Sequence, residues 1–193
     1  LTQASGILPV SHPAAEKGRA TKGAAIAMLA KVKMYNANTQ SKWAQVLDLT
    51  EQVMALPYSL ATDFNGMFRV SGENNSESIF EVQANAFGNN CGTYCQYSEI
   101  QAVRGQFGWG FNIPTSSLEA AFEPGDQRKD ATLLRRGQTT VEGDIIISNT
   151  FNPLYNKKVY VPLSVPNPCG WGYGRDQNRR ILRLGEIYLI RAE

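Results

Sequence analysis

Hydrophobic residues recur at helical spacing in two neighbouring segments near the start of the chain. Within residues 20–36 the apolar face comprises Ala24, Met28, Val32 and Tyr35, and within 41–56 it comprises Val46, Leu47, Val53 and Met54. Intervals of three and four residues place side chains on one face of an α-helix. The polar stretch NANTQS separates the two segments, and Pro57 ends the second. The pattern predicts an antiparallel helical hairpin over residues 20–56, packed through these two faces.

The end of the chain, RLGEIYLIRAE at 183–193, also favours a helix. Leu184, Ile187, Tyr188 and Arg191 follow helical spacing, and Leu189 and Ile190 make the segment apolar on nearly every side. No Gly, Asn or Pro follows as a stop signal. The six residues LGEIYL also repeat the pattern of LAKVKM in the first helix. We therefore expect residues 181–193 to start a further helical hairpin and the chain to be an internal fragment of a longer protein.

The long middle segment, residues 57–180, has a different character. Residues 79–83 are rich in β-forming side chains and predict a short strand, and DIIIS at 144–148 predicts another. A helix is expected near 115–122, before the Pro-Gly pair. Residues 86–113 are dominated by Gly, Asn and aromatic side chains, which is too aromatic for disorder and too irregular for a helix. We expect an ordered, loop-rich binding region.

Composition narrows the class of protein. The 193 residues are 42% hydrophobic and 19% charged, as in a globular protein with a sizeable core. The net charge of +2 is small, and the arginine pairs in LLRRG and DQNRR are isolated, so we do not expect a nucleic-acid partner.

Catalytic and metal-binding motifs are weak or absent in the sequence. GRATKGAA has the glycine spacing of a phosphate-binding loop, but Ala24 and Ala25 stand where Lys and Ser or Thr are needed. His12 is the only histidine, and a C-x3-C spacing without a second cluster is a poor zinc signature. The pairing of the three cysteines, if any, stays open; they are Cys91, Cys95 and Cys169. We expect no cofactor, no metal and no catalysis, with a glycoside hydrolase as the less favoured alternative.

Several motifs occur in a recognisable order. They are RATKGAAIAMLAKVKMYNANTQSKWAQVLDLTEQVM, PYSL, NNSESIFEVQ, GWGFNIPTSSLEAAFEPGDQRKDATLL, YNKKVYVP and NRRILRLGEIYLIRAE. Because these motifs occur in this order, the chain from about Arg19 onward resembles the SusD/RagB family of outer-membrane nutrient-binding lipoproteins. The family's lipidated N-terminal Cys, first helices and C-terminal region have no counterpart here. The resemblance implies a mainly α, SusD-like fold: one domain of tetratricopeptide-like hairpins with a loop-rich aromatic insertion containing short β-strands.

The resemblance also implies a function. Proteins of this starch-utilisation type bind oligosaccharides at the cell surface and deliver them, without catalysis, to a TonB-dependent SusC-like transporter in the outer membrane. Membrane contact would come only through an N-terminal lipid anchor that this chain lacks. A tetratricopeptide-like protein-interaction adaptor and peptide capture are the alternatives. The sequence does not identify the ligand, because specificity lies in loops.

The candidate glycan-binding residues lie in the irregular segments. A pyranose ring stacks its C–H face on an aromatic ring, while its hydroxyls need amide and guanidinium partners. Trp109 is the foremost candidate because Asn112, Gln101 and Arg104 lie within a few residues of it. Further candidates are Phe111, Tyr94, Tyr97, Trp171 and Tyr173. For each of these aromatic residues, core packing is the alternative role.

Overall fold

The computed structural model describes residues 1–84, 96–149, 151–167, 170 and 175–193. These residues form two compact units. The first, here called the helical unit, comprises Leu1–Thr62, Asn74–Gln83 and Arg180–Glu193. The second, the loop unit, comprises Asp63–Glu73 and Ala84–Arg179. Most of the predicted loop-rich region therefore belongs to the loop unit, although its strand near residue 80 belongs to the helical unit.

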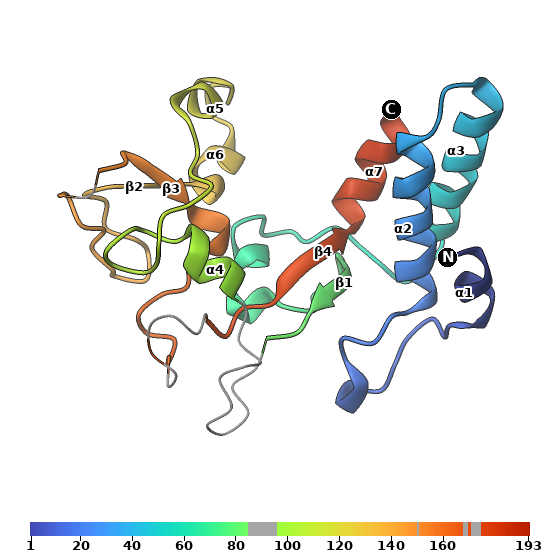
Figure 1. Ribbon diagram of the computed structural model, residues 1–193, viewed down its shortest axis with the longest axis horizontal. Helices are drawn as coiled ribbons and strands as arrows, with labels where there is room; N and C mark the ends of the chain where they lie inside the picture. The colour runs from blue at the N-terminus through green and yellow to red at the C-terminus, as the bar shows by residue number, and fades with distance from the viewer. Residues whose placement is uncertain (85–95, 150, 168–169, 171–174) are drawn as a thin grey trace. The chain divides into compact units, whose positions relative to one another are not determined.

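The helical unit is built around three helices, α2 (Lys22–Tyr35), α3 (Gln40–Met54) and α7 (Leu184–Ala192). A short helix α1 (Thr2–Ile7) and a 3-10 turn (Ala14–Glu16) precede them. Threonine side chains cap both hairpin helices: Thr21 accepts a hydrogen bond from the Ala24 amide, and Thr39 accepts one from the Lys42 amide. Helices α2 and α3 run antiparallel (Figure 1), which confirms the predicted hairpin.

The core of the helical unit combines small residues on one helix with branched residues on its neighbours. Ala27 and Ala30 of α2 are fully buried, and small side chains let two helix backbones approach closely. The buried stripe of α3 consists of Val46, Leu49, Thr50 and Val53. The buried residues of α7 are Leu184, Ile187 and Ile190. Burying one such aliphatic side chain contributes about 1.5–3 kcal/mol.

Three residues of the predicted hairpin interface are in fact exposed. Val32, Tyr35 and Leu47 are 52%, 80% and 43% exposed, so the prediction that they pack between the helices is wrong. The buried positions of α2 cluster at Gly23–Ala27 and Ala30 instead. Helix α2 therefore presents its small residues inward, and the size of a side chain is a poor guide to which face of this helix is buried.

A two-stranded sheet leads into α7, the last helix of the helical unit. Strand β1 (Ser78–Val82) pairs with β4 (Arg179–Arg183), and α7 begins at the next residue. The predicted strand at 79–83 is confirmed. The helix expected from residue 181 starts at Leu184, because residues 181–183 belong to the strand that pairs with β1. Buried Glu77 anchors this junction: its carboxylate accepts hydrogen bonds from Arg183 (2.5 Å) and the Ala61 amide (3.0 Å).

The apolar pattern of the last helix is only partly explained by packing. Ile187 and Ile190 face the core, whereas Tyr188 and Leu189 are 43% and 72% exposed. On the polar side, Glu186 forms an ion pair of 2.7 Å with Lys31 of α2. The helix is therefore apolar on an exposed side as well as on its buried one, as the sequence indicated.

The loop unit has short elements. Its helices are α4 (Gln96–Gln101), α5 (Ser116–Ala120) and α6 (Gln127–Thr132), and its antiparallel strands are β2 (Leu133–Arg135) and β3 (Leu154–Asn156). In the part of this unit that the structure describes, 3-10 turns cover Gly66–Phe68, Val70–Gly72 and Lys157–Val159. Helix α5, capped by Thr115, confirms the helix predicted near 115–122. The buried core comprises Ala102, Val103, Phe107, Leu134, Ile146, Tyr155 and Tyr160.

The strand predicted at 144–148 does not form. Residue 145 makes one isolated bridge to Thr139. Ile146 donates to the Gln138 carbonyl (2.8 Å) and accepts from the Gly137 amide (2.9 Å), but the segment does not continue as a strand. The side chain of Gln106 instead donates to the Ile145 carbonyl (2.6 Å) and accepts from the Ile147 amide (3.0 Å). The backbone of residues 137–140 and the side chain of Gln106 together supply hydrogen bonds that a neighbouring strand would make.

Within the described residues, no helix has the length and hydrophobicity needed to cross a membrane.

Candidate functional site

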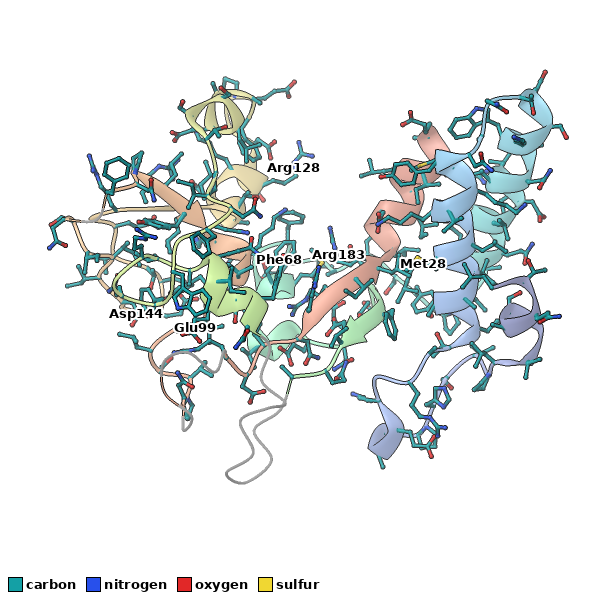
Figure 2. The ribbon with its side chains drawn as sticks, in the orientation of Figure 1. Met28, Phe68, Glu99, Arg128, Asp144 and Arg183 are labelled. Atoms are coloured by element: carbon teal, nitrogen blue, oxygen red, sulfur yellow. The ribbon has the colours of Figure 1, made fainter. Side chains whose placement is uncertain are left out.

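The loop that follows α4 is held against the end of that helix by backbone hydrogen bonds. The amide of Trp109 donates to the carbonyl of Glu99 (2.9 Å), and the amide of Phe111 donates to the carbonyl of Ile100 (2.9 Å). Carbonyls in the last turn of a helix have no partner within the helix. The loop amides therefore provide hydrogen-bond donors for the last carbonyls of α4, and the same bonds fix the backbone of the loop. Glu99 of this helix is labelled in Figure 2.

Two glycines make this close approach possible. A Cβ atom on Gly108 would lie 1.8 Å from the Glu99 carbonyl oxygen, so no other residue fits there. Gly110 has φ +70°, and its Cβ would lie 2.8 Å from Cβ of Arg104. The Gly-Trp-Gly sequence thus fixes the backbone on both sides of Trp109.

The aromatic residues of the loop alternate between core and surface. Phe107 is buried and packs edge-to-face on Tyr160, with 5.5 Å between ring centroids. Trp109 and Phe111 are 43% and 52% exposed and stand edge-to-face to each other, 6.2 Å apart at 80°. We call Trp109 and Phe111 the aromatic patch. Core packing therefore accounts for Phe107 but leaves much of the patch uncovered.

An amide cluster lies beside the patch. Asn112 is exposed, has φ +49°, and donates through Nδ2 to Oε1 of Gln101 (2.9 Å). The same oxygen accepts from Nδ2 of Asn156 (3.1 Å). Gln101 is only 6% exposed, so its predicted direct contact with a ligand is not supported by its position. We expect Gln101 to position Asn112 instead.

Cationic side chains lie close to both ends of α4. Arg104, which is exposed, donates through Nε to the carbonyl of Trp109 (3.0 Å). Tyr97 is half-buried, and the guanidinium of Arg179 lies 5.0 Å from its ring centroid, a cation–π contact. The structure therefore associates Arg104, Trp109, Phe111, Asn112 and Gln101 in one loop system, with Tyr97 on the helix that supports it.

Three predicted site residues, Tyr94, Trp171 and Tyr173, lie outside the described residues, as do the three cysteines.

A buried arginine supports the segment that carries Tyr160. Arg69 donates to the carbonyls of Lys157 (3.1 Å) and Tyr160 (3.0 Å), and to Oδ1 of Asn65 (2.8 Å). Burial lowers the pKa of Lys157, whose Nζ donates to the Asp130 carbonyl, and burial raises the pKa of Tyr160, whose hydroxyl donates to Asp144. These groups act as internal cross-links of the loop unit.

The acidic residues near α5 and α6 form surface ion pairs. A hydrogen bond from Arg135 lowers the pKa of Glu119, and one from Arg128 lowers the pKa of Asp126. No group of three or more His, Cys, Asp or Glu side chains suited to a metal ion occurs among the described residues.

Sequence reasoning missed two members of this surface. Asn156 is 44 residues from Asn112 in the chain, and only the fold brings both amides to Gln101. Arg179 reaches Tyr97 in the same way. Both residues lie in the second aromatic-rich stretch, residues 155–180, but nothing in the local sequence placed either of them beside α4.

Comparison with solved structures identifies the fold of the chain. No protein-family model and no curated protein sequence matches the chain. Solved structures do match. A laminarin-binding SusD-like protein has 25% identity and a TM-score of 0.78, with 99% of this chain and 47% of that chain covered. Surface glycan-binding protein A from Bacteroides fluxus has 23% identity and a TM-score of 0.80, with 97% and 42% covered.

A third match is surface glycan-binding protein A from Bacteroides thetaiotaomicron in complex with laminarihexaose. It has 19% identity and a TM-score of 0.72, and the alignment covers 97% of this chain and 45% of that chain. The fold is therefore that of the mainly helical, tetratricopeptide-like class with an irregular insertion. It is a SusD-like fold, as the sequence resemblance indicated, and the chain spans less than half of the length of these three structures.

Proposed function

We propose that this chain is part of a SusD-like protein that binds oligosaccharides at the cell surface and does not break them down. The observation that carries the proposal is the exposed aromatic patch, Trp109 and Phe111, held beside the amide of Asn112 and the guanidinium of Arg104. The solved structures with the same fold support it, since their names describe surface glycan binding and, for one, laminarin binding.

The chemistry of the patch suits a sugar ring. The C–H face of a pyranose covers an indole, and hydroxyl groups at the ring edge exchange hydrogen bonds with amides and guanidinium groups. Because the loop backbone is already fixed, binding orders few additional groups. An open patch still buries little area, so we expect affinities between micromolar and millimolar, roughly −8 to −4 kcal/mol.

Delivery is the second part of the proposal. In the complete protein, we propose an N-terminal lipid anchor in the outer membrane and hand-over of the bound oligosaccharide to a TonB-dependent SusC-like transporter. Weak binding suits this role because a ligand held at micromolar to millimolar affinity dissociates readily. Co-purification of the full-length protein with a transporter of this class would test the partner, and an anchored protein recovered alone from detergent extracts would argue against it.

Binding itself is tested with a glycan array followed by calorimetry on the best ligand. Trp109→Ala should weaken binding by about 1–3 kcal/mol because it removes the stacking surface. Phe111→Ala should weaken binding less, and Phe151→Ala is its matched control, because Phe151 is an 89% exposed phenylalanine elsewhere in the loop unit. Circular dichroism checks that each variant is folded. Unchanged affinity in a folded Trp109→Ala protein would remove the patch from the site.

A further inference from the structure

We infer that the aromatic patch selects acidic glycans, with Arg104 binding the carboxylate of a uronate residue. This inference rests on the proposed function, because it assumes that a sugar ring stacks on the patch. It adds a substrate class: oligosaccharides that carry hexuronate units.

The guanidinium of Arg104 is held at one edge and open at the other. Its Nε donates to the carbonyl of Trp109 (3.0 Å), which fixes the group against the loop. Gly110 leaves room for the stem of Arg104, since any Cβ there would lie 2.8 Å from Cβ of Arg104. An arginine held through Nε keeps its two terminal nitrogens for a second partner.

Arg104 differs from three other exposed arginines of the chain, each of which has a carboxylate partner. Arg19, Arg128 and Arg191 each form an ion pair with a glutamate or aspartate at 2.7–2.9 Å. Among the residues that the structure describes, Arg104 makes no ion pair with any carboxylate. Its positive charge is therefore available to a ligand.

The surroundings reinforce this charge. The carboxylate of Glu99, on the helix beneath the loop, is 1% exposed and so is covered from any surface ligand. Arg179 adds a second exposed cation over Tyr97 and likewise forms no ion pair among the described residues. Near α4, the described surface thus offers positive charge, aromatic faces and neutral amides.

This combination matches a uronate more closely than a neutral sugar. The C5 carboxylate of a hexuronate projects from the edge of the ring, so a ring stacked on Trp109 directs it sideways toward a neighbouring cation. Two parallel hydrogen bonds from a guanidinium to a carboxylate are roughly twice as strong as bonds between neutral groups. A hydroxyl of a neutral sugar accepts only the weaker kind.

The test compares acidic oligosaccharides with neutral partners of the same length and linkage. Oligogalacturonate, alginate and glucuronoxylan oligomers are each titrated beside their methyl esters, which remove the charge and add one methyl group per uronate, and beside laminarihexaose. For the best pair, we expect the acid to bind about tenfold more tightly than its ester at low salt. High salt should reduce this preference, because it screens an exposed ion pair.

Two variants test whether Arg104 causes the preference for the acid over the ester. Arg104→Gln should abolish the difference between acid and ester, because it removes the positive charge. It should also weaken ester binding, because Arg104 lies beside the aromatic patch, so the readout is the ratio of the two affinities. Arg128→Gln is the matched control, since it removes one exposed arginine from α6 of the same unit and should leave the preference intact.

Equal binding of acid and ester, or a preference that survives Arg104→Gln, would overturn the inference. If neutral ligands still bind through Trp109, the proposed function stands without it. If no oligosaccharide binds through the patch, both proposals are wrong.

Discussion

The helical unit and the loop unit are stabilised in different ways. In the helical unit, α2, α3 and α7 satisfy most of their own backbone groups and pack through aliphatic side chains. In the loop unit, polar side chains reach backbone groups that are far away in the sequence: Arg69 contacts residues 88 and 91 positions away, and Gln177 reaches Phe68 across 109 positions. Irregular backbone needs such partners because buried amides and carbonyls are costly when unpaired. A fixed loop surface therefore depends on buried polar residues, which regular helices do not require.

The largest expected effect is the loss of a core side chain in the helical unit. Ile187→Ala, at a fully buried position of α7, should lower the free energy of unfolding of this unit by about 2–5 kcal/mol, through lost burial and the cavity that remains. Thermal unfolding followed by far-ultraviolet circular dichroism measures it. Leu189→Ala is the control on the same helix: at 72% exposure it should change stability by less than about 0.5 kcal/mol. Similar losses for both variants would contradict the packing described for α7.

In the loop unit, the buried residue whose loss should matter most is polar: Arg69. Arg69→Met keeps an apolar stem but removes the guanidinium that donates to the carbonyls of Lys157 and Tyr160 and to the amide oxygen of Asn65. We expect a loss of about 2–4 kcal/mol, seen as faster hydrogen exchange in the loop unit and unchanged exchange in α2 and α3. Arg128→Met, at an exposed position (Figure 2), should have little effect. An Arg69→Met protein as stable as the parent would show that the buried network contributes nothing.

The next effect concerns the backbone beside Trp109. Gly110→Ala places a Cβ at φ +70° and 2.8 Å from Arg104, so we expect it to cost about 1–3 kcal/mol and to weaken glycan binding. Gly125→Ala separates the two causes, because Gly125 has φ +81° but a Cβ added there would meet no atom within 4 Å. If both variants lose equal stability and binding is kept in both, the close approach of Arg104 to the loop has no functional role.

The smallest effect is electrostatic. The pKa of Glu119 is lowered from its ordinary value of 4.5, first of all by its hydrogen bond from Arg135. A carboxyl with a lowered pKa stabilises the folded state above its unfolded pKa, and this contribution is lost as the pH falls through the folded pKa. Stability of the loop unit should therefore decline slightly below about pH 4.5, and Glu119→Gln should flatten that part of the curve. Arg135→Gln should flatten it in the same way, and an unchanged slope in both variants would show that the pair is inactive.

The same contrast explains what the sequence could predict. The hairpin, the strand near residue 80 and helix α5 follow from local periodicity and capping, and all three are confirmed. The exposure of Leu47 and Tyr35 was not predictable, because it depends on which face of each helix meets its neighbours. The segment 144–148, predicted as a strand, bonds in part to the backbone of residues 137–140 and in part to a glutamine side chain 39 to 41 residues away, a partner that the local sequence does not reveal.

For the candidate site, the sequence identified Trp109 and its amide and guanidinium neighbours by proximity along the chain. It named Trp109 and Phe111 with core packing as the alternative role, and only the fold shows that both are exposed whereas Phe107 of the same segment is buried. It also placed Gln101 among direct contacts, whereas the fold buries that side chain beneath Asn112.

One measurement compares the two units during binding. Trp43 belongs to α3 of the helical unit and Trp109 to the aromatic patch, so their indole N–H signals in a proton–nitrogen correlation spectrum report on one unit each. Trp43→Phe and Trp109→Phe variants assign the signals. On titration with the best array ligand, we predict a saturable shift of the Trp109 signal, with the affinity found by calorimetry, and a stationary Trp43 signal. Saturable binding that moves the Trp43 signal and leaves that of Trp109 unchanged would contradict glycan capture by the loop unit.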